Sequence, residues 1–136
     1  MKPLSDDIKN YIAAAHVCRI ATVRADGEPH VIPVCPVFDG DNTVYVDIGP
    51  KSVTGLALAH DDRVAVLFDE YFDDWGKLRK VLLKCRAERV TGADQDAVWE
   101  MIRTKFPQYA SGWKPRATMA LRIYDWLQEG IETPAH

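Results

Sequence analysis

Short runs of strand-forming residues, separated by turn signals, are the feature that most restricts how this chain can fold. The runs occupy residues 17–25, 30–38, 43–48, 63–71, 81–90 and 117–127. Asp26-Gly27 marks a hairpin turn, and the sequence DGDN at 39–42 marks the next turn. Helical spacing of apolar residues is confined to the segments 6–15, 52–60 and 94–106. The pattern predicts a mainly β fold with flanking helices, in which six antiparallel strands form a small barrel or sandwich.

Length and composition indicate one soluble domain over residues 1–136, with 47% hydrophobic and 27% charged residues. The net charge of −3 gives no reason to expect a nucleic-acid partner, and no apolar run is long enough to span a membrane. The N-terminal sequence MKPLSDDIKN is too polar for a signal peptide. Cys18, Cys35 and Cys85 fit reduced thiols better than a disulfide framework. We therefore expect a cytoplasmic protein without nucleic-acid or membrane partners.

Several classes of catalytic and metal site lack their sequence signature. The chain has no G-x-S-x-G nucleophile motif, no H-E-x-x-H or C-x-x-C metal spacing and no glycine-rich phosphate loop. We therefore predict no metal site, and the sequence identifies no catalytic residue.

Two prolines interrupt the strand that begins near residue 30. Pro29 and Pro33 cannot donate hydrogen bonds to a β ladder, so prolines in sheets are confined to edges, strand starts or bulges. Two interpretations remain open. The strand is either a protected sheet edge, or one whose free backbone groups and apolar surface face a flat polar heterocycle.

Two further features suggest ligand contacts. In the sequence GPKSV, Lys51 and Ser52 precede a predicted helix, whose N-terminus would suit a phosphate. A surface lysine beside a capping serine would look the same. Trp75, in a polar loop, and Trp126, at the end of the last strand, would either pack in the core or rim or cover a bound aromatic ring.

Four segments together resemble the pyridoxamine 5′-phosphate oxidase-like family of FMN-binding split barrels. In order, they read RIATVRADGEPHVIPV, VYVDIGPKSVTGLAL, RVAVLFDEYFDDW and VLLKCRAERVTG, and they cover most of residues 17–92. The pattern A-T-V-x-A-D-G-x-P-H-x-x-P-V is the most specific part. The pattern D-x-Y-x-D-D-W is similar to a subgroup described as probable deazaflavin-dependent enzymes.

This resemblance implies a six-stranded antiparallel split β-barrel that forms a homodimer with cofactor sites between the subunits. It also implies FMN, or alternatively a deazaflavin, as the cofactor. Residues that match the family's cofactor contacts are His30, Val31, Ile32, Pro33, Val46, Asp47, Lys51, Ser52 and Lys80, with Trp75 and Trp126 reaching in from the loop and the last strand. A basic cluster of Lys77, Arg79, Lys80, Lys114 and Arg116 would either bind a deazaflavin tail or be a solvated surface.

The chain also departs from the true oxidase of this family. As the resemblance aligns the two proteins, the oxidase carries an arginine at the position of His30 and a lysine at the position of Cys35. The C-terminal substrate segment of the oxidase has no counterpart in this chain. These departures argue against vitamin B6 oxidation. The expected function is therefore a flavin- or deazaflavin-dependent oxidoreductase acting on an unidentified small molecule. The alternative is a non-catalytic barrel that stores or senses flavin or haem, with His30 or His16 as the haem ligand.

Overall fold

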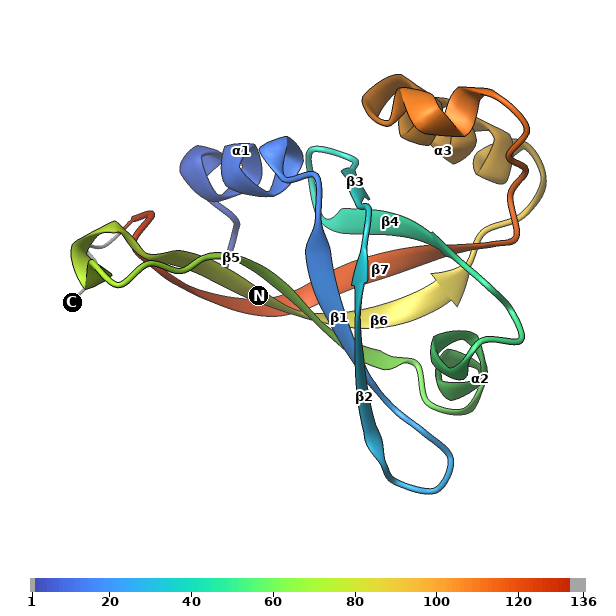
Figure 1. Ribbon diagram of the computed structural model, residues 1–136, viewed down its shortest axis with the longest axis horizontal. Coiled ribbons are helices and arrows are strands. Elements are labelled where there is room, and N and C mark those ends of the chain that lie inside the picture. The colour runs from blue at the N-terminus through green and yellow to red at the C-terminus, as the bar shows by residue number, and fades with distance from the viewer. Residues whose placement is uncertain (1, 133–136) are drawn as a thin grey trace.

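The computed structural model describes residues 2–132, which form one curled antiparallel sheet with helices along its rims (Figure 1). The helices are α1 (Asp6–Ala14), α2 (Val53–His60) and α3 (Gly92–Lys105), with short 3-10 turns η1 (Trp75–Lys77) and η2 (Pro107–Ala110). The strands are β1 (Cys18–Val23), β2 (Pro29–Val34), β3 (Val37–Phe38), β4 (Thr43–Ile48), β5 (Arg63–Glu70), β6 (Arg79–Arg89) and β7 (Ala117–Glu129). None of the helices within residues 2–132 is long and apolar enough to cross a membrane.

The sheet has seven strands in the order β2-β1-β5-β6-β7-β4-β3, so the predicted count of six is corrected to seven. The predicted strand at 30–38 is broken at Cys35 and Pro36. Its first part, β2, forms one edge of the sheet, and its second part, β3, forms the opposite edge. Because two residues connect the edges, the sheet must curl until they lie close together. This geometry confirms the predicted mainly β, split-barrel architecture.

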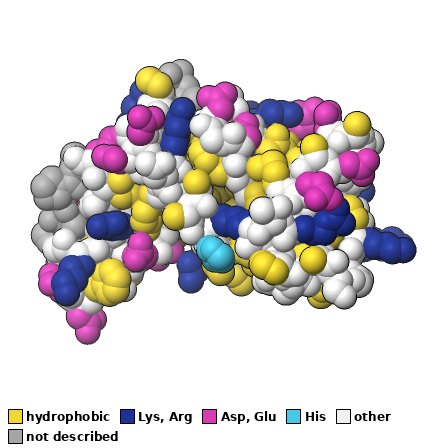
Figure 2. All heavy atoms as spheres, turned by 90° about the horizontal axis from the view of Figure 1, so that it is seen from above, with side chains coloured by type: hydrophobic (Ala, Val, Ile, Leu, Met, Phe, Trp, Pro, Cys, Tyr) yellow, Lys and Arg dark blue, Asp and Glu magenta, His cyan; other side chains and the backbone are white. Residues whose placement is uncertain are grey.

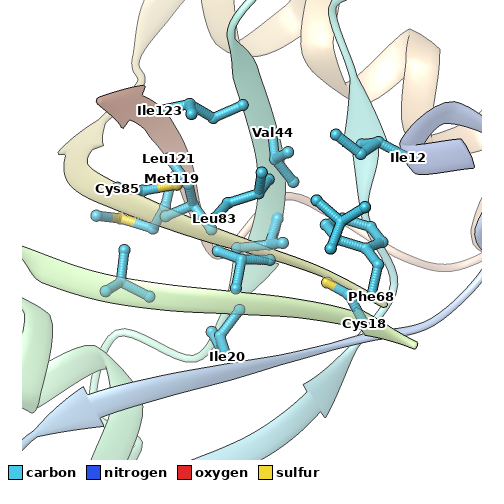
Figure 3. Packing of buried hydrophobic residues seen from close by; sticks show 14 of the residues in the cluster. Ile12, Cys18, Ile20, Val44, Phe68, Leu83, Cys85, Met119, Leu121 and Ile123 are labelled. Atoms are coloured by element: carbon cyan, nitrogen blue, oxygen red, sulfur yellow. The ribbon is translucent and has the colours of Figure 1, made fainter. Parts of the chain in front are cut away.

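The interior of the curl is filled by alternate residues of the strands (Figure 3). Ile20, Phe68, Leu83 and Leu121 come from four different strands, and each is 1% exposed or less. Helix α1 closes one end, where Ile8 and Ile12 are completely or almost completely buried. A second cluster lies between β3 and the apolar face of α3, and it consists of Val37, Val98, Trp99, Ile102 and Phe106. Figure 2 shows basic, acidic and apolar side chains interspersed on the face seen from above.

The positions of the two prolines follow from the hydrogen-bond pattern of the β1–β2 hairpin. The backbone N–H of Arg24 donates to the carbonyl oxygen of Glu28 at 2.9 Å, next to the hairpin turn. Hydrogen-bonded pairs alternate along an antiparallel ladder, so Pro29, Val31 and Pro33 occupy the positions whose backbone groups point away from β1. The prolines therefore remove no ladder bond. The edge-strand interpretation is confirmed, and the backbone of Val31 faces the open edge.

Candidate functional site

A cavity of about 310 Å³ lies where β2, the end of β4, the start of α2 and the α3–η2 segment meet. Four predicted residues line it, namely Ile32, Pro33, Asp47 and Ser52. Ile32 and Pro33, both from β2, provide an apolar wall. Asp47 and Ser52 lie at the other end of the cavity, which is polar. The cavity therefore combines an apolar surface with a small number of polar groups, as ligand sites usually do.

Asp47 and Arg116 form the polar end of this cavity, although 69 residues separate them in the chain. The Asp47 carboxylate accepts hydrogen bonds from the backbone N–H of Arg116 at 3.1 Å and from its Nε at 3.2 Å. It also accepts one from the Thr118 hydroxyl at 3.2 Å. The contact follows from the pairing of β4 with β7, which places Asp47 opposite Thr118. Arg116 is thereby presented at the cavity wall.

The start of α2 forms the adjoining wall and is held in position by Ser52. The Ser52 hydroxyl accepts a hydrogen bond from the backbone N–H of Gly55 at 3.1 Å and donates one to the carbonyl oxygen of Gly49 at 2.6 Å. Ser52 is therefore the N-cap residue of α2. Gly55 is required because a Cβ atom there would clash with the carbonyl oxygens of Gly49 and Pro50. The turn thus packs directly against the first turn of the helix.

A cluster of aromatic residues, none of them predicted as site residues, reaches the cavity through Tyr109. Tyr109 lines the cavity, and burial raises the pKa of its hydroxyl above the ordinary value. Its ring contacts those of Trp99, at 5.8 Å between centroids, and Trp113, at 5.5 Å. Trp113 is 55% exposed. An exposed tryptophan beside a cavity-lining tyrosine offers a flat surface next to the opening.

Cys35 also lines the cavity, in the segment that crosses from β2 to β3. This segment is secured by Lys105, whose ammonium group donates hydrogen bonds to the carbonyl oxygens of Ala15 and Pro36 at 2.5 and 2.9 Å. Burial lowers the pKa of Lys105. One side chain from α3 therefore ties the end of α1 to the crossing segment.

The other predicted site residues do not line this cavity. His30 and Val31 lie farther along β2, with His30 half-buried and Val31 63% exposed. Val46 is completely buried in the core, so its side chain cannot reach a ligand. Lys51 is exposed beside Ser52 but is not part of the cavity wall.

Lys80, Trp75 and Trp126 belong to a different part of the molecule. Lys80 is half-buried near the start of β6. Trp75 lies 56% exposed in η1, at the tip of the β5–β6 hairpin, and Figure 1 shows this tip at the opposite end of the protomer from α2. Trp126 is buried, and its indole N–H donates to the carbonyl oxygen of Lys2 at 3.0 Å.

A larger hollow of about 670 Å³ opens between α1, the end of β5 and the start of β6. Its lining includes Tyr11, His16, Glu70 and Arg79. Burial, reinforced by the neighbouring Glu70 carboxylate, raises the pKa of Tyr11 to about 12. The Tyr11 hydroxyl therefore keeps its proton further into the alkaline range than an ordinary tyrosine does.

A curled antiparallel sheet whose two edge strands are joined by two residues defines a split β-barrel. The chain matches the family model described as pyridoxamine 5′-phosphate oxidase over residues 4–128. It therefore belongs to this family, as the resemblance predicted. No functionally curated protein sequence matches it.

Solved structures share the fold at low sequence identity. A haem-binding protein from Mycobacterium smegmatis is 18% identical with a TM-score of 0.80, and the match covers 96% of this chain but only 55% of that chain. The haem storage protein HutZ from Vibrio cholerae is 16% identical with a TM-score of 0.75, covering 92% and 94%. A FAD-binding protein from Mesorhizobium loti is 19% identical with a TM-score of 0.70, covering 93% and 95%.

Proposed function

We propose that the protein binds a flavin, FMN in particular, in the cavity beside β2 and acts as an oxidoreductase on a small molecule. The observation that carries this proposal is the pairing of an apolar strand edge with the guanidinium of Arg116 at one cavity. When bound, the flavin would supply the hydride chemistry. Family membership and the FAD-binding neighbour support the proposal.

The residues of this cavity fit a planar, phosphate-bearing cofactor. Ile32 and Pro33 would contact the ring, and the backbone N–H and C=O of Val31 face the open edge, where they would bond its polar rim. The first backbone N–H groups of α2, which Ser52 positions as the N-cap, and the guanidinium of Arg116 would hold the phosphate. These residues would bind and orient the cofactor, while Tyr109 and Trp113 would limit the access of water.

FMN fits the distribution of charge better than a deazaflavin with an acidic tail. Arg116 lies at the cavity, whereas Lys77 and Arg79 line a separate hollow near the β5–β6 hairpin. Within one protomer, the predicted basic cluster is therefore divided between two sites. The long anionic tail of a deazaflavin bound at the cavity would therefore reach only some of the residues in this basic cluster.

We further propose that the protein is a homodimer with the cofactor sites between subunits. The outer face of the sheet carries apolar residues from five neighbouring strands, namely Val31, Ala21, Pro33, Leu67, Leu82 and Leu127. Arg19 lies between Pro33 and Leu67 on this face and pairs with Asp69. Val31 is 63% and Leu127 45% exposed. A self-complementary apolar face of this kind suits a two-fold interface. Such an interface could bring Trp75 of one subunit towards the cavity of the other.

Titration of the purified protein with FMN and with a deazaflavin, followed by visible absorption, tests the proposed cofactor. We expect saturation with one FMN per subunit, followed by reduction of the bound FMN when a pyridine nucleotide is added and its reoxidation by an acceptor. Failure of both cofactors to bind would contradict flavin binding. Stable binding without turnover would support a storage or sensing role instead.

Haem binding without catalysis is the second candidate function, and it would use the larger hollow. Two structural neighbours are described as haem proteins, and this hollow carries the exposed imidazole of His16 beside the ring of Phe106. The test is visible absorption after haem is added to the wild-type protein and to His16→Ala. We expect a Soret band from bound haem in the wild type and its loss in the variant. A His30→Ala variant is the matched control, since His30 lines neither of the two cavities described above. Equal spectra for wild type and His16→Ala would exclude His16 as the ligand.

A further inference from the structure

We infer that Arg116 selects ligands that carry a terminal phosphate, and that Asp47, Thr118 and Gln95 hold its guanidinium in position. The inference rests on the proposed flavin site and identifies how that site would distinguish FMN from riboflavin. Arg116 is the binding residue in this scheme, and Asp47 is a positioning residue that acts through it.

The hydrogen bonds of Asp47 are directed at the protein rather than at the cavity. Its side chain is only 5% exposed, and its carboxylate accepts the N–H groups of Arg116 and the hydroxyl of Thr118 described above. A nearly buried carboxylate with these partners would also repel an anionic ligand. Any favourable effect of Asp47 on such a ligand must therefore be exerted through the orientation of Arg116.

The guanidinium of Arg116 is only partly used by these contacts. Nε donates to the Asp47 carboxylate, and Nη2 donates to the Asp47 carbonyl oxygen at 3.2 Å. Nη1 makes no hydrogen bond with any residue in the range 2–132 that the structure describes. Two N–H groups at one end of a fixed, planar cation are therefore available to an oxyanion.

The space in front of Nη1 is kept open by Gly49. A Cβ atom at this position would lie 3.7 Å from Nη1 of Arg116 and 3.7 Å from Oγ of Ser52. These are ordinary van der Waals distances, so an alanine would fit without a clash but would occupy part of the space between the guanidinium and the first turn of α2. A phosphate bound beside Gly49 would meet the free edge of Arg116 on one side and the helix N-terminus on the other.

A chain of hydrogen bonds extends this arrangement to α3. The Gln95 amide Nε2 donates to the Thr118 hydroxyl at 3.0 Å, and that hydroxyl donates to Asp47. Thr118 is completely buried. In addition, Nη2 of Arg89 donates to the backbone carbonyl oxygen of Arg116 at 3.0 Å. Both the backbone and the side chain of Arg116 are thereby fixed before a ligand arrives, which lowers the entropy cost of binding.

The test compares FMN with riboflavin, which has the same ring but no phosphate. We would measure the dissociation constants of both for the wild type and for Arg116→Gln, Arg116→Lys and Asp47→Asn. The ratio of the two constants is the readout. Arg122→Gln is the matched control, because Arg122 lies in β7, which begins directly after Arg116, is similarly exposed and pairs with Glu88 at 2.9 Å.

We expect the wild type and Arg122→Gln to prefer FMN by the same factor, tenfold or more. Arg116→Gln should lose about tenfold in FMN affinity while riboflavin affinity changes by less than about threefold. Arg116→Lys should recover only part of the preference, and Asp47→Asn should lower it without affecting riboflavin.

Equal losses for FMN and riboflavin in Arg116→Gln would overturn this inference and leave flavin binding standing. An unchanged preference in that variant would overturn it as well. If the wild type binds neither flavin, the proposed function itself fails, and the inference falls with it. Thermal unfolding of each variant identifies misfolded protein, and Arg116 is half exposed, so we expect its variants to fold.

Discussion

Two buried threonines on different strands, Thr22 on β1 and Thr43 on β4, differ in whether their hydroxyl groups have hydrogen-bond partners. Thr22 is 2% exposed, and its Oγ1 has no hydrogen-bond partner within residues 2–132. Thr43 is 1% exposed, and its Oγ1 donates to Asn42 at 3.0 Å and accepts from Arg122 at 3.4 Å. A buried hydroxyl without a partner costs free energy, whereas a paired one does not.

We therefore expect opposite effects from the same substitution at these positions. Thr22→Val should leave the free energy of unfolding unchanged or raise it by about 1 kcal/mol, because it removes an unsatisfied polar atom. Thr43→Val should lower it by about 1 kcal/mol. Urea denaturation of the two variants measures the difference. A loss of stability in Thr22→Val as large as that in Thr43→Val would show that the Thr22 hydroxyl is satisfied.

Gly55 is a second position where a single residue type is needed. We expect Gly55→Ala to lower the free energy of unfolding by about 1–3 kcal/mol, because the new methyl group overlaps the 49–50 backbone. FMN affinity should fall as well, since this turn forms part of the cavity wall. Denaturation and FMN titration measure both effects. Gly76→Ala is the control, because its Cβ atom would lie 3.2 Å from the flexible Asp74 side chain, and equal losses in both variants would contradict the argument.

At the scale of the elements, Lys105 links its own helix, α3, to the end of α1 and to the segment between β2 and β3. No strand pairing joins these three segments. We expect Lys105→Met to lower the free energy of unfolding by about 1–2 kcal/mol, because the carbonyl groups of Ala15 and Pro36 lose a charged donor. The cost of burying an ammonium group offsets part of the lost bonds. Chemical denaturation measures the change, with the exposed Lys77→Met as control. Equal stabilities of the two variants would show that this tie contributes nothing.

Most elements could be predicted from the sequence because their signals are local. The cap of α1 at Ser5, the hairpin at Asp26-Gly27 and the apolar spacing in α3 each lie within a few residues. The break at Cys35 and Pro36 was missed because strand-forming residues continue on both sides of it. What separates β2 from β3 is their placement at opposite edges of the sheet, and this depends on long-range pairing.

The candidate site was predicted only in part for the same reason. Ile32, Pro33, Asp47 and Ser52 lie in the segments that carry the family resemblance, and they meet at one cavity. The position of Arg116 depends on the register between β4 and β7, which no local pattern specifies. The core position of Val46 follows from the alternation of its strand, whereas its neighbour Asp47 points the other way.

At the scale of the whole molecule, stability should decline in alkali because of buried thiols. Burial raises the pKa of Cys85 from its ordinary value of 9.0 to about 12, and it does the same for Cys18. Unfolded thiols ionise near pH 9 while the buried ones remain protonated, so their stabilisation is complete below pH 9 and is lost as the pH rises towards 12. The lowered pKa of Lys105 acts in the opposite direction over part of this range.

We therefore expect the free energy of unfolding to fall above pH 9, by at most about 1.4 kcal/mol per pH unit for each thiol. Urea denaturation between pH 8 and pH 11 measures this decline. Cys85→Ala should show a shallower decline, whatever its stability at neutral pH. Parallel pH profiles for wild type and variant would rule out the contribution of Cys85.

The proposed self-association also belongs to the scale of the whole molecule. If the proposed dimer uses the apolar outer face, Val31→Asp should shift the protein from dimer to monomer, because it places a charge on that face at the edge strand β2. Folding should be retained, since Val31 is 63% exposed. Sedimentation measures the mass, and Val53→Asp on α2, 43% exposed, is the control. A dimeric Val31→Asp variant would exclude this face as the interface.

The two-residue connection between β2 and β3 has a consequence for the size of ligand that can be accepted. The circumference of the barrel is limited at this point by covalent bonds, whereas elsewhere it depends on hydrogen bonds that can lengthen or break. Cys35, within this connection, also borders the cavity. The opening beside the edge strand therefore has an inextensible rim, and a ligand too bulky for it would be excluded by the length of the chain itself.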